Sequence, residues 1–140
     1  MSRHVARFFP DDSRGVSLVE FALVAPLLMM ILLGMLGYGQ YFLLAHSAQQ
    51  IANDAARATI SGMSPDERLT LAQGALTRER PNLPEIAASS ATVSVDEALP
   101  TVTVHVTIDA SRIGLFRVNL LPMPDPTIVR SAVIQQGGVL

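Results

Sequence analysis

Residues 21–45 read FALVAPLLMMILLGMLGYGQYFLLA, and these 25 positions contain no charged side chain. At about 1.5 Å per residue they would form a helix of roughly 37 Å, longer than the hydrocarbon core of about 30 Å. The centre, residues 27–33, is apolar on every side, whereas a surface helix of a soluble protein keeps a polar face. Tyr38 and Tyr41 lie near the distal end, where aromatic residues are typical of the membrane interface. The run therefore predicts one transmembrane helix.

A secretory signal peptide is the alternative interpretation of this run. Such a peptide has an apolar core of about 7–15 residues, followed by a small-residue cleavage site. The run here is longer, and the residues after it continue a helical pattern instead of opening into a loop. We therefore favour a membrane anchor that stays in the mature protein.

The charges on the two sides of the run predict its orientation. Three arginines precede it: Arg3, Arg7 and Arg14. The first charges beyond it are Asp54 and Arg57. An excess of basic residues marks the cytoplasmic side, so the N-terminus is expected in the cytoplasm and the remainder outside it. The expected organisation is a cytoplasmic leader at 1–15, a transmembrane helix at 16–45 and an exported, periplasmic domain at 46–140.

The helical pattern continues past the membrane segment. Apolar and small residues recur at three- and four-residue spacing: Tyr41, Leu44, Ala45, Ala48, Ile51, Ala52, Ala55 and Thr59. The other face is polar: His46, Gln49, Gln50, Asn53, Asp54 and Arg57. This spacing is typical of an amphipathic helix, and alanine favours helix while allowing a partner to approach closely. One helix is therefore expected from about Val16 to about Ser61, with Gly62 ending it.

The rest of the chain predicts a second helix and three strands. Ser64 can cap a helix that begins at Pro65 and runs to about Arg80, with Glu67 completing a capping box. Strands are expected at 91–96, 101–109 and 127–135, the first two joined as a hairpin. The segment 111–126 is expected to be irregular, as are 81–84 and the end from Gly137 onward.

The clearest strand indicates how the domain would be packed. In residues 101–109, Val102, Val104, Val106 and Ile108 alternate with polar residues, which is typical of a half-buried strand. A hairpin alone is marginal in water, and the alanine-rich stripe is the obvious partner for its valine face. The expected class is α+β: a long N-terminal helix whose first half is transmembrane, a short second helix, and a small antiparallel β-sheet packed on the distal half.

Composition excludes several kinds of function. The chain has no cysteine, so a thiolate metal site and a cysteine nucleophile are excluded. The net charge of -2 provides no field that would attract nucleic acid. His4, His46 and His105 lack the spacing of metal ligands, and no acid pair, serine motif or phosphate loop is found. We expect no catalytic residues, metal, cofactor, nucleic acid or small-molecule substrate, and no enzymatic activity.

One motif lies at the start of the apolar run. Arg14-Gly15-Val16 is followed by a lone acid, Glu20, and an aromatic, Phe21. A carboxylate inside an apolar segment costs free energy, so a charge placed there is a functional hypothesis by default. The simpler interpretation is that Glu20 lies in the headgroup region and is solvated. Position alone leaves both interpretations open.

The stretch resembles the cleavage site of Flp-type prepilins and, more narrowly, the TadE-like family of the tight-adherence (Tad) pilus system. The matching residues are Arg14-Gly15, Val19-Glu20-Phe21-Ala22-Leu23-Val24, Pro26-Leu27-Leu28, Leu33-Gly34, Gly39 and Ala52-Asn53-Asp54-Ala55-Ala56-Arg57. The resemblance implies that a prepilin peptidase in the inner membrane cuts after Gly15 and exposes the amine of Val16. It also implies that Glu20 pairs with the amine of a neighbouring pilin-like subunit, with Arg14 and Phe21 in the processing signal.

Two residues depart from the family pattern. Members often carry a second acid late in the span, where this chain has Gly37, so the role of that acid is in doubt here. Ala55 stands where a glycine is common, which is a mild change. Pro26 interrupts the helical hydrogen-bond ladder. We favour a tolerated kink at Pro26 over local melting for filament packing.

The first functional hypothesis is therefore a minor pilin or pseudopilin of the Tad secretion system, serving pilus assembly and adhesion. Its expected partners are the prepilin peptidase, other pilin-like subunits, the Tad machinery and membrane lipid. The alternative is an uncleaved bitopic membrane protein whose exported domain binds another envelope component. A membrane-tethered enzyme finds no support in the residues. Location in the inner membrane is expected under both hypotheses, and entry into the pilus stays open.

Overall fold

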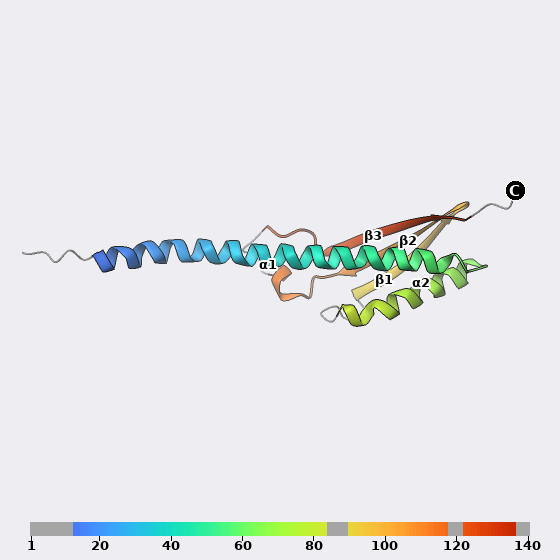
Figure 1. The fold of residues 1–140 in the computed structure, drawn as a ribbon, viewed down its shortest axis with the longest axis horizontal. Coiled ribbons are helices and arrows are strands. Elements are labelled where there is room, and N and C mark those ends of the chain that lie inside the picture. The colour runs from blue at the N-terminus through green and yellow to red at the C-terminus, as the bar shows by residue number, and fades with distance from the viewer. Residues whose placement is uncertain (1–12, 84–89, 118–121, 137–140) are drawn as a thin grey trace, which may run out of the picture.

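The computed structural model describes residues 13–83, 90–117 and 122–136. The helices are α1 (Ser13–Thr59) and α2 (Pro65–Glu79), the strands β1 (Ala91–Ala98), β2 (Thr101–Asp109) and β3 (Thr127–Gln135), and the 3-10 helices η1 (Arg80–Asn82) and η3 (Gly114–Arg117). Figure 1 shows α1 as a long rod whose first half projects alone, while α2 and the strands lie along its second half. The predicted α+β class is confirmed.

The three strands form one antiparallel sheet in the order β1-β2-β3. On the central strand β2, the predicted apolar face is fully buried: Val102, Val104, Val106 and Ile108. The helices cover this face, with α1 against β2 and β3 and α2 against β1. The opposite face carries partly exposed polar residues such as Thr103 and Thr107. Strict alternation on β2 thus places one row of side chains in the core and the other toward solvent.

The core forms where the alanine-rich stripe of α1 meets the sheet. Ala48, Ala52 and Ala55 have no exposed surface. Ala48 and Ala52 belong to a cluster with Val106 and Ile108, as the sequence predicted. Short side chains allow the helix backbone to lie close to the sheet, where a larger side chain would force the two apart.

The second helix is packed by the same kind of contact. Ala56, which the predicted stripe did not include, is buried in a cluster with Ala55, Ala72, Ala75 and Val104. The stripe on α1 is therefore wide enough to contact both the sheet and α2. The sequence pattern did not reveal this second contact, because Ala56 fits a helix whether it is buried or exposed.

Several boundaries differ from the prediction. Helix α1 ends at Thr59 rather than Ser61, β1 extends to Ala98, and the segment predicted as a loop from Pro81 begins as η1. The segment predicted as irregular contains η3. The expectation for the C-terminal end from Gly137 onward falls outside the residues described. Just before α2, Ser64 caps the helix as predicted, by accepting a hydrogen bond from the Glu67 backbone N–H at 3.3 Å.

A buried arginine joins the α1–α2 connection to the sheet. The Arg68 Nε donates to the Gly62 carbonyl oxygen at 3.1 Å, and Nη1 lies 2.8 Å from the Glu97 Oε2. The side chains of Arg68 and Glu97 are only 10% and 19% exposed. The Gln136 side-chain oxygen, in the orientation that satisfies the amide, accepts from Nε and Nη2 at 2.9 Å each. The Glu97 carboxylate therefore forms an ion pair that joins the end of β1 to α2.

Gly62 allows Arg68 of α2 to lie close to the backbone after α1, and it does not adopt an unusual backbone angle. No glycine among the described residues has a positive φ. A Cβ at Gly62 would lie 2.6 Å from the Arg68 Cγ and 3.1 Å from its backbone nitrogen. The prediction that Gly62 ends α1 was therefore wrong, because the helix has already ended at Thr59.

Replacing Gly62 with alanine is expected to destabilise the domain by about 1–3 kcal/mol, because backbone atoms of α2 cannot move aside cheaply. The matched control is Gly74→Ala in the middle of α2, where nothing lies within 4 Å of an added Cβ. That change should stabilise the helix by about 0.5–1 kcal/mol. Thermal unfolding of both variants, followed by circular dichroism in detergent, measures the difference. Equal effects at the two positions would contradict this role for Gly62.

Candidate processing and anchoring segment

The predicted cleavage site lies in the first turn of α1. The helix begins at Ser13, so Arg14, Gly15 and Val16 all belong to that turn. The side chain of Val16 is 60% exposed. No described part of the domain covers this end of α1, which projects away from the sheet in Figure 1. The segment is thus accessible to another protein.

Glu20 and Phe21 follow one turn later on the same projecting helix. Glu20 is exposed, and Phe21 is 67% exposed. Within the residues that the structure describes, no hydrogen bond or ion pair to Glu20 is found. Residues four apart lie on the same face of a helix, so Val16 and Glu20 are neighbours about 6 Å apart along the axis. A partner for this carboxylate must therefore come from the chain terminus, the solvent or another molecule.

The apolar residues beyond Glu20 are uncovered. Helix α1 continues without interruption through Pro26. Leu23, Leu28 and Ile31 are each about half exposed or more, and no residue of the most apolar 18-residue window of α1 is buried. Among the described residues, α1 alone is long and apolar enough to cross a membrane. A buried core helix of a soluble protein would not leave this surface open.

The packed part of α1 begins at Gly37. This residue is buried, and a Cβ there would lie 2.6 Å from the Met123 Cε. The adjacent Tyr38 hydroxyl donates to the Pro122 carbonyl oxygen at 2.7 Å. The helix from Ser13 to Leu36 would measure about 36 Å, which is enough to cross a hydrocarbon core of about 30 Å. Gly37, noted above as a departure from the family pattern, thus lies against the Met123 side chain.

The remaining polar groups make local pairs and no metal site. His46 Nε2 lies 3.2 Å from the Gln50 amide nitrogen, and His105 Nε2 lies 3.2 Å from the Asp96 Oδ2. In the described ranges, no group of three or more histidine, aspartate or glutamate side chains could hold a metal ion. At the end of β2, hydrogen bonds from Ser111 hold the pKa of Asp109 below its usual value of 3.8.

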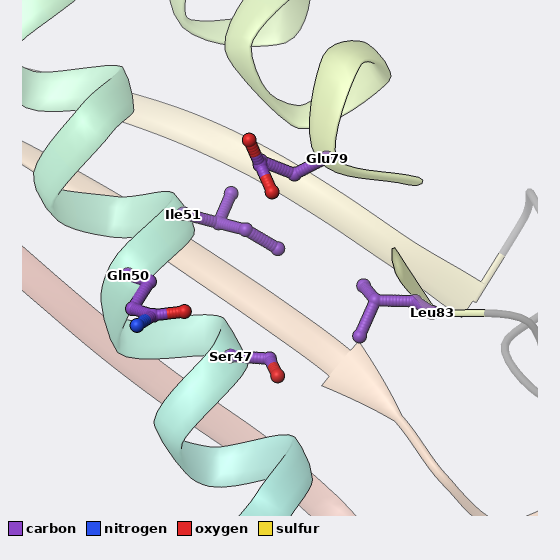
Figure 2. A pocket seen from close by; sticks show the side chains of 5 residues that line it. All are labelled: Ser47, Gln50, Ile51, Glu79 and Leu83. Carbon is purple, nitrogen blue, oxygen red and sulfur yellow. The ribbon is translucent and has the colours of Figure 1, made fainter. Parts of the chain in front are cut away.

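A small pocket lies where the end of α2 meets α1. Figure 2 shows the five side chains that line it: Ser47, Gln50, Ile51, Glu79 and Leu83. Its volume is about 180 Å³. Ligand pockets usually measure about 300–1,000 Å³. Among the described residues that line it, Glu79 is the one carboxylate and none is a histidine.

These features define a class of protein: an α+β domain built on the second half of a long helix whose first half is a candidate membrane span. Residues 15–57 match a family model described as TadE-like protein, so the resemblance seen in the sequence is confirmed over this segment. The match shows a likeness to TadE-like proteins over this segment and not over the rest of the chain. It includes Gly15, Glu20 and Pro26, and it ends two residues before the end of α1.

Neither the curated proteins nor the solved structures contained a match to this chain. The family match covers neither α2 nor any strand. The sequence analysis singled out residues of the projecting half, but it did not single out Arg68, which binds Glu97, or Met123, which lies against Gly37. No local signal identifies them, because each is defined by a partner distant in the sequence.

Proposed function

We propose that this protein is a minor pilin or pseudopilin of a Tad, Flp-type pilus, held in the cytoplasmic membrane by α1 and cut by a prepilin peptidase after Gly15. The observation that carries the proposal is that the TadE-like match over residues 15–57 includes the uncovered first half of α1. The matched segment contains both Gly15 and the lone acid Glu20. The protein would act as a structural and assembly component and not as an enzyme.

The chemistry of Gly15 and Val16 suits such processing. Gly15 has no Cβ, so a peptidase can approach the backbone closely at the bond to be cut. Cleavage would convert the amide nitrogen of Val16 into a charged amine at the start of an apolar helix. Glu20 would then lie one turn from that new positive charge.

Glu20 would set the register between subunits. A carboxylate in low dielectric attracts an amine strongly, and leaving either charge unpaired there is costly. Pairing with the Val16 amine of a neighbour would align two α1 helices by a fixed axial offset. The carboxylate also lies near the N-terminus of the mature helix, where the helix dipole favours a negative charge.

The test is the intact mass of the membrane-extracted protein, with N-terminal sequencing, in strains with and without a prepilin peptidase. We expect a chain that begins at Val16 when the peptidase is present and a full-length chain when it is absent. A Gly15→Leu variant should stay full-length in both strains, while Gly39→Ala, a glycine of the same helix with open space around it, should be cut normally.

Retention of residues 1–15 in both strains would contradict the pilin proposal. It would leave the alternative of an uncleaved bitopic protein, whose exported domain binds an envelope component. Loss of pili on deletion, together with cleavage, would distinguish the first hypothesis from the second.

A further inference from the structure

Two described parts of the connection between β2 and β3 lie against α1 where the domain begins. We call the described residues Gly114–Arg117 and Pro122–Pro126 the collar. Figure 1 shows the two parts on opposite sides of α1. On one side the Phe116 ring is 6.4 Å from the Tyr41 ring, between centroids. On the other, Pro122 accepts the hydrogen bond from Tyr38.

The collar contacts α1 inside the charge-free run. Its contacts fall on Gly37, Tyr38 and Tyr41, all within residues 21–45. If Glu20 lies at the inner headgroup level, a hydrocarbon core of about 30 Å extends about 20 residues along α1, to Gln40. The outer boundary of the core therefore falls at the level of the collar.

The groups at this level fit a membrane interface. Phe42 and Leu43 of α1 are 66% and 65% exposed. Arg112 and Arg117 are exposed at either end of η3. Aromatic rings favour the headgroup level, and arginine forks match lipid phosphates in geometry and charge. The two acids nearby, Asp109 and Asp125, accept backbone hydrogen bonds from Ser111 and Thr127.

We infer that the collar rests on the outer headgroup region of the bilayer, so that the domain lies against the membrane and is not held off it. The inference rests on the proposed anchoring by α1. The occupant of this surface is lipid, because α1 itself enters the apolar phase at the level of the collar. Arg112 and Arg117 would bind anionic headgroups there.

Single cysteines can test this depth, because the chain has none of its own. Three glycines have open space for a side chain: Gly39 in α1 at the collar level, Gly114 in the collar and Gly74 in α2. Gly74 lies beside Ala72 and Ala75, which pack with Ala55. Ala55 lies about 27 Å beyond Gly37 along the helix axis.

Each cysteine variant of the full chain would carry a fluorophore in vesicles of phosphatidylethanolamine and phosphatidylglycerol with nitroxide-labelled lipid. We expect labels at Gly39→Cys and Gly114→Cys to lose most of their fluorescence with a headgroup-level nitroxide, and the label at Gly74→Cys to lose none. Leu28→Cys is the reference within the span and should be quenched by a nitroxide deep in the acyl chain.

The outcomes separate the two proposals. An unquenched Leu28→Cys label would show that α1 does not cross the bilayer, which removes the anchor itself. Quenched Leu28→Cys and Gly39→Cys with an unquenched Gly114→Cys would keep the anchor and overturn the collar inference. Protection of Gly114→Cys in cells but not in these vesicles would indicate a protein partner and would also overturn it.

A second probe avoids the labelled cysteine. The chain has no tryptophan, so Phe116→Trp would report alone. Its emission should be quenched by brominated lipid, whereas Ile60→Trp, at a 63% exposed position beyond the end of α1, should not respond. Equal responses of the two variants would contradict the inference.

Discussion

Replacing Glu20 with alanine should leave cleavage after Gly15 intact and reduce pilus assembly by at least about tenfold. The physical reason is the amine of a neighbouring Val16, which would enter an apolar helix bundle without its counter-charge. Removing one partner of a buried ion pair costs about 3–5 kcal/mol, and each 1.4 kcal/mol is a factor of about ten. The structure supports this role, since Glu20 is exposed and lies at the start of the uncovered apolar surface.

The measurement has two parts. N-terminal sequencing establishes whether the Glu20→Ala chain is cut, and pilus counts with co-purification of pilin-like subunits measure assembly. Glu20→Gln keeps the shape and removes the charge, so it should behave like the alanine variant. The control is Asp96→Asn on β1, where the side chain is 75% exposed and the same formal charge is lost far from α1's first half.

Normal assembly of a cleaved Glu20→Ala chain would contradict the pairing and support the solvated interpretation of this carboxylate. Loss of cleavage itself would move Glu20 into peptidase recognition. Because the processing and assembly measurements are separate, these two failures are distinguishable.

Arg68→Met is expected to produce the largest loss of folding stability, about 2–4 kcal/mol. It leaves the Glu97 carboxylate, 19% exposed, without its cation. It also removes the donors that bind the Gly62 and Gln136 oxygens. Breaking a buried ion pair costs about 3–5 kcal/mol, and the remaining exposure of both side chains lowers that figure. Urea unfolding of the detergent-solubilised chain, followed by circular dichroism, gives the value.

The double variant Arg68→Met/Glu97→Met separates the charge from the packing. Replacing both partners with apolar groups removes the unpaired carboxylate, so most of the lost stability should return. Arg78→Met is the matched control, because Arg78 is exposed on the same helix and its loss should cost under about 0.5 kcal/mol. If Arg68→Met lowers the free energy of unfolding no more than Arg78→Met does, the contacts of Arg68 with Glu97 and Gln136 do not hold the α1–α2 connection to the sheet.

Local periodicity made much of the fold predictable. Strands β2 and β3 have the predicted bounds. On β2 the strict alternation of side chains encodes a sheet face directly. The stripe from Tyr41 to Thr59 is buried or partly buried as predicted, since its spacing matches the helical repeat. The helix start at Pro65 followed from the Ser64 cap. Each of these signals lies within a few neighbouring residues.

The candidate site was predictable for a similar reason. Gly15, Glu20 and the apolar run form one continuous stretch, so the resemblance to TadE-like proteins was visible without any packing. The family match over residues 15–57 confirms the resemblance, while the roles of Gly15 and Glu20 are untested. Charge and length alone indicated the membrane span, because crossing a bilayer demands a long run without charges. Cleavage after Gly15 and pairing by Glu20 stay predictions.

The tertiary structure alone decided what joins the helix to the rest of the domain. Arg68 meets Glu97 and Gln136, Met123 covers Gly37, and Phe116 contacts Tyr41. The partners in each contact lie tens of residues apart, so no repeat of two or of three to four residues encodes them. A glycine such as Gly37 or Gly62 looks the same in the sequence whether it is open or tightly packed. The tertiary structure decides this, because it brings Arg68 of α2 against Gly62 and Met123 of the β2–β3 connection against Gly37.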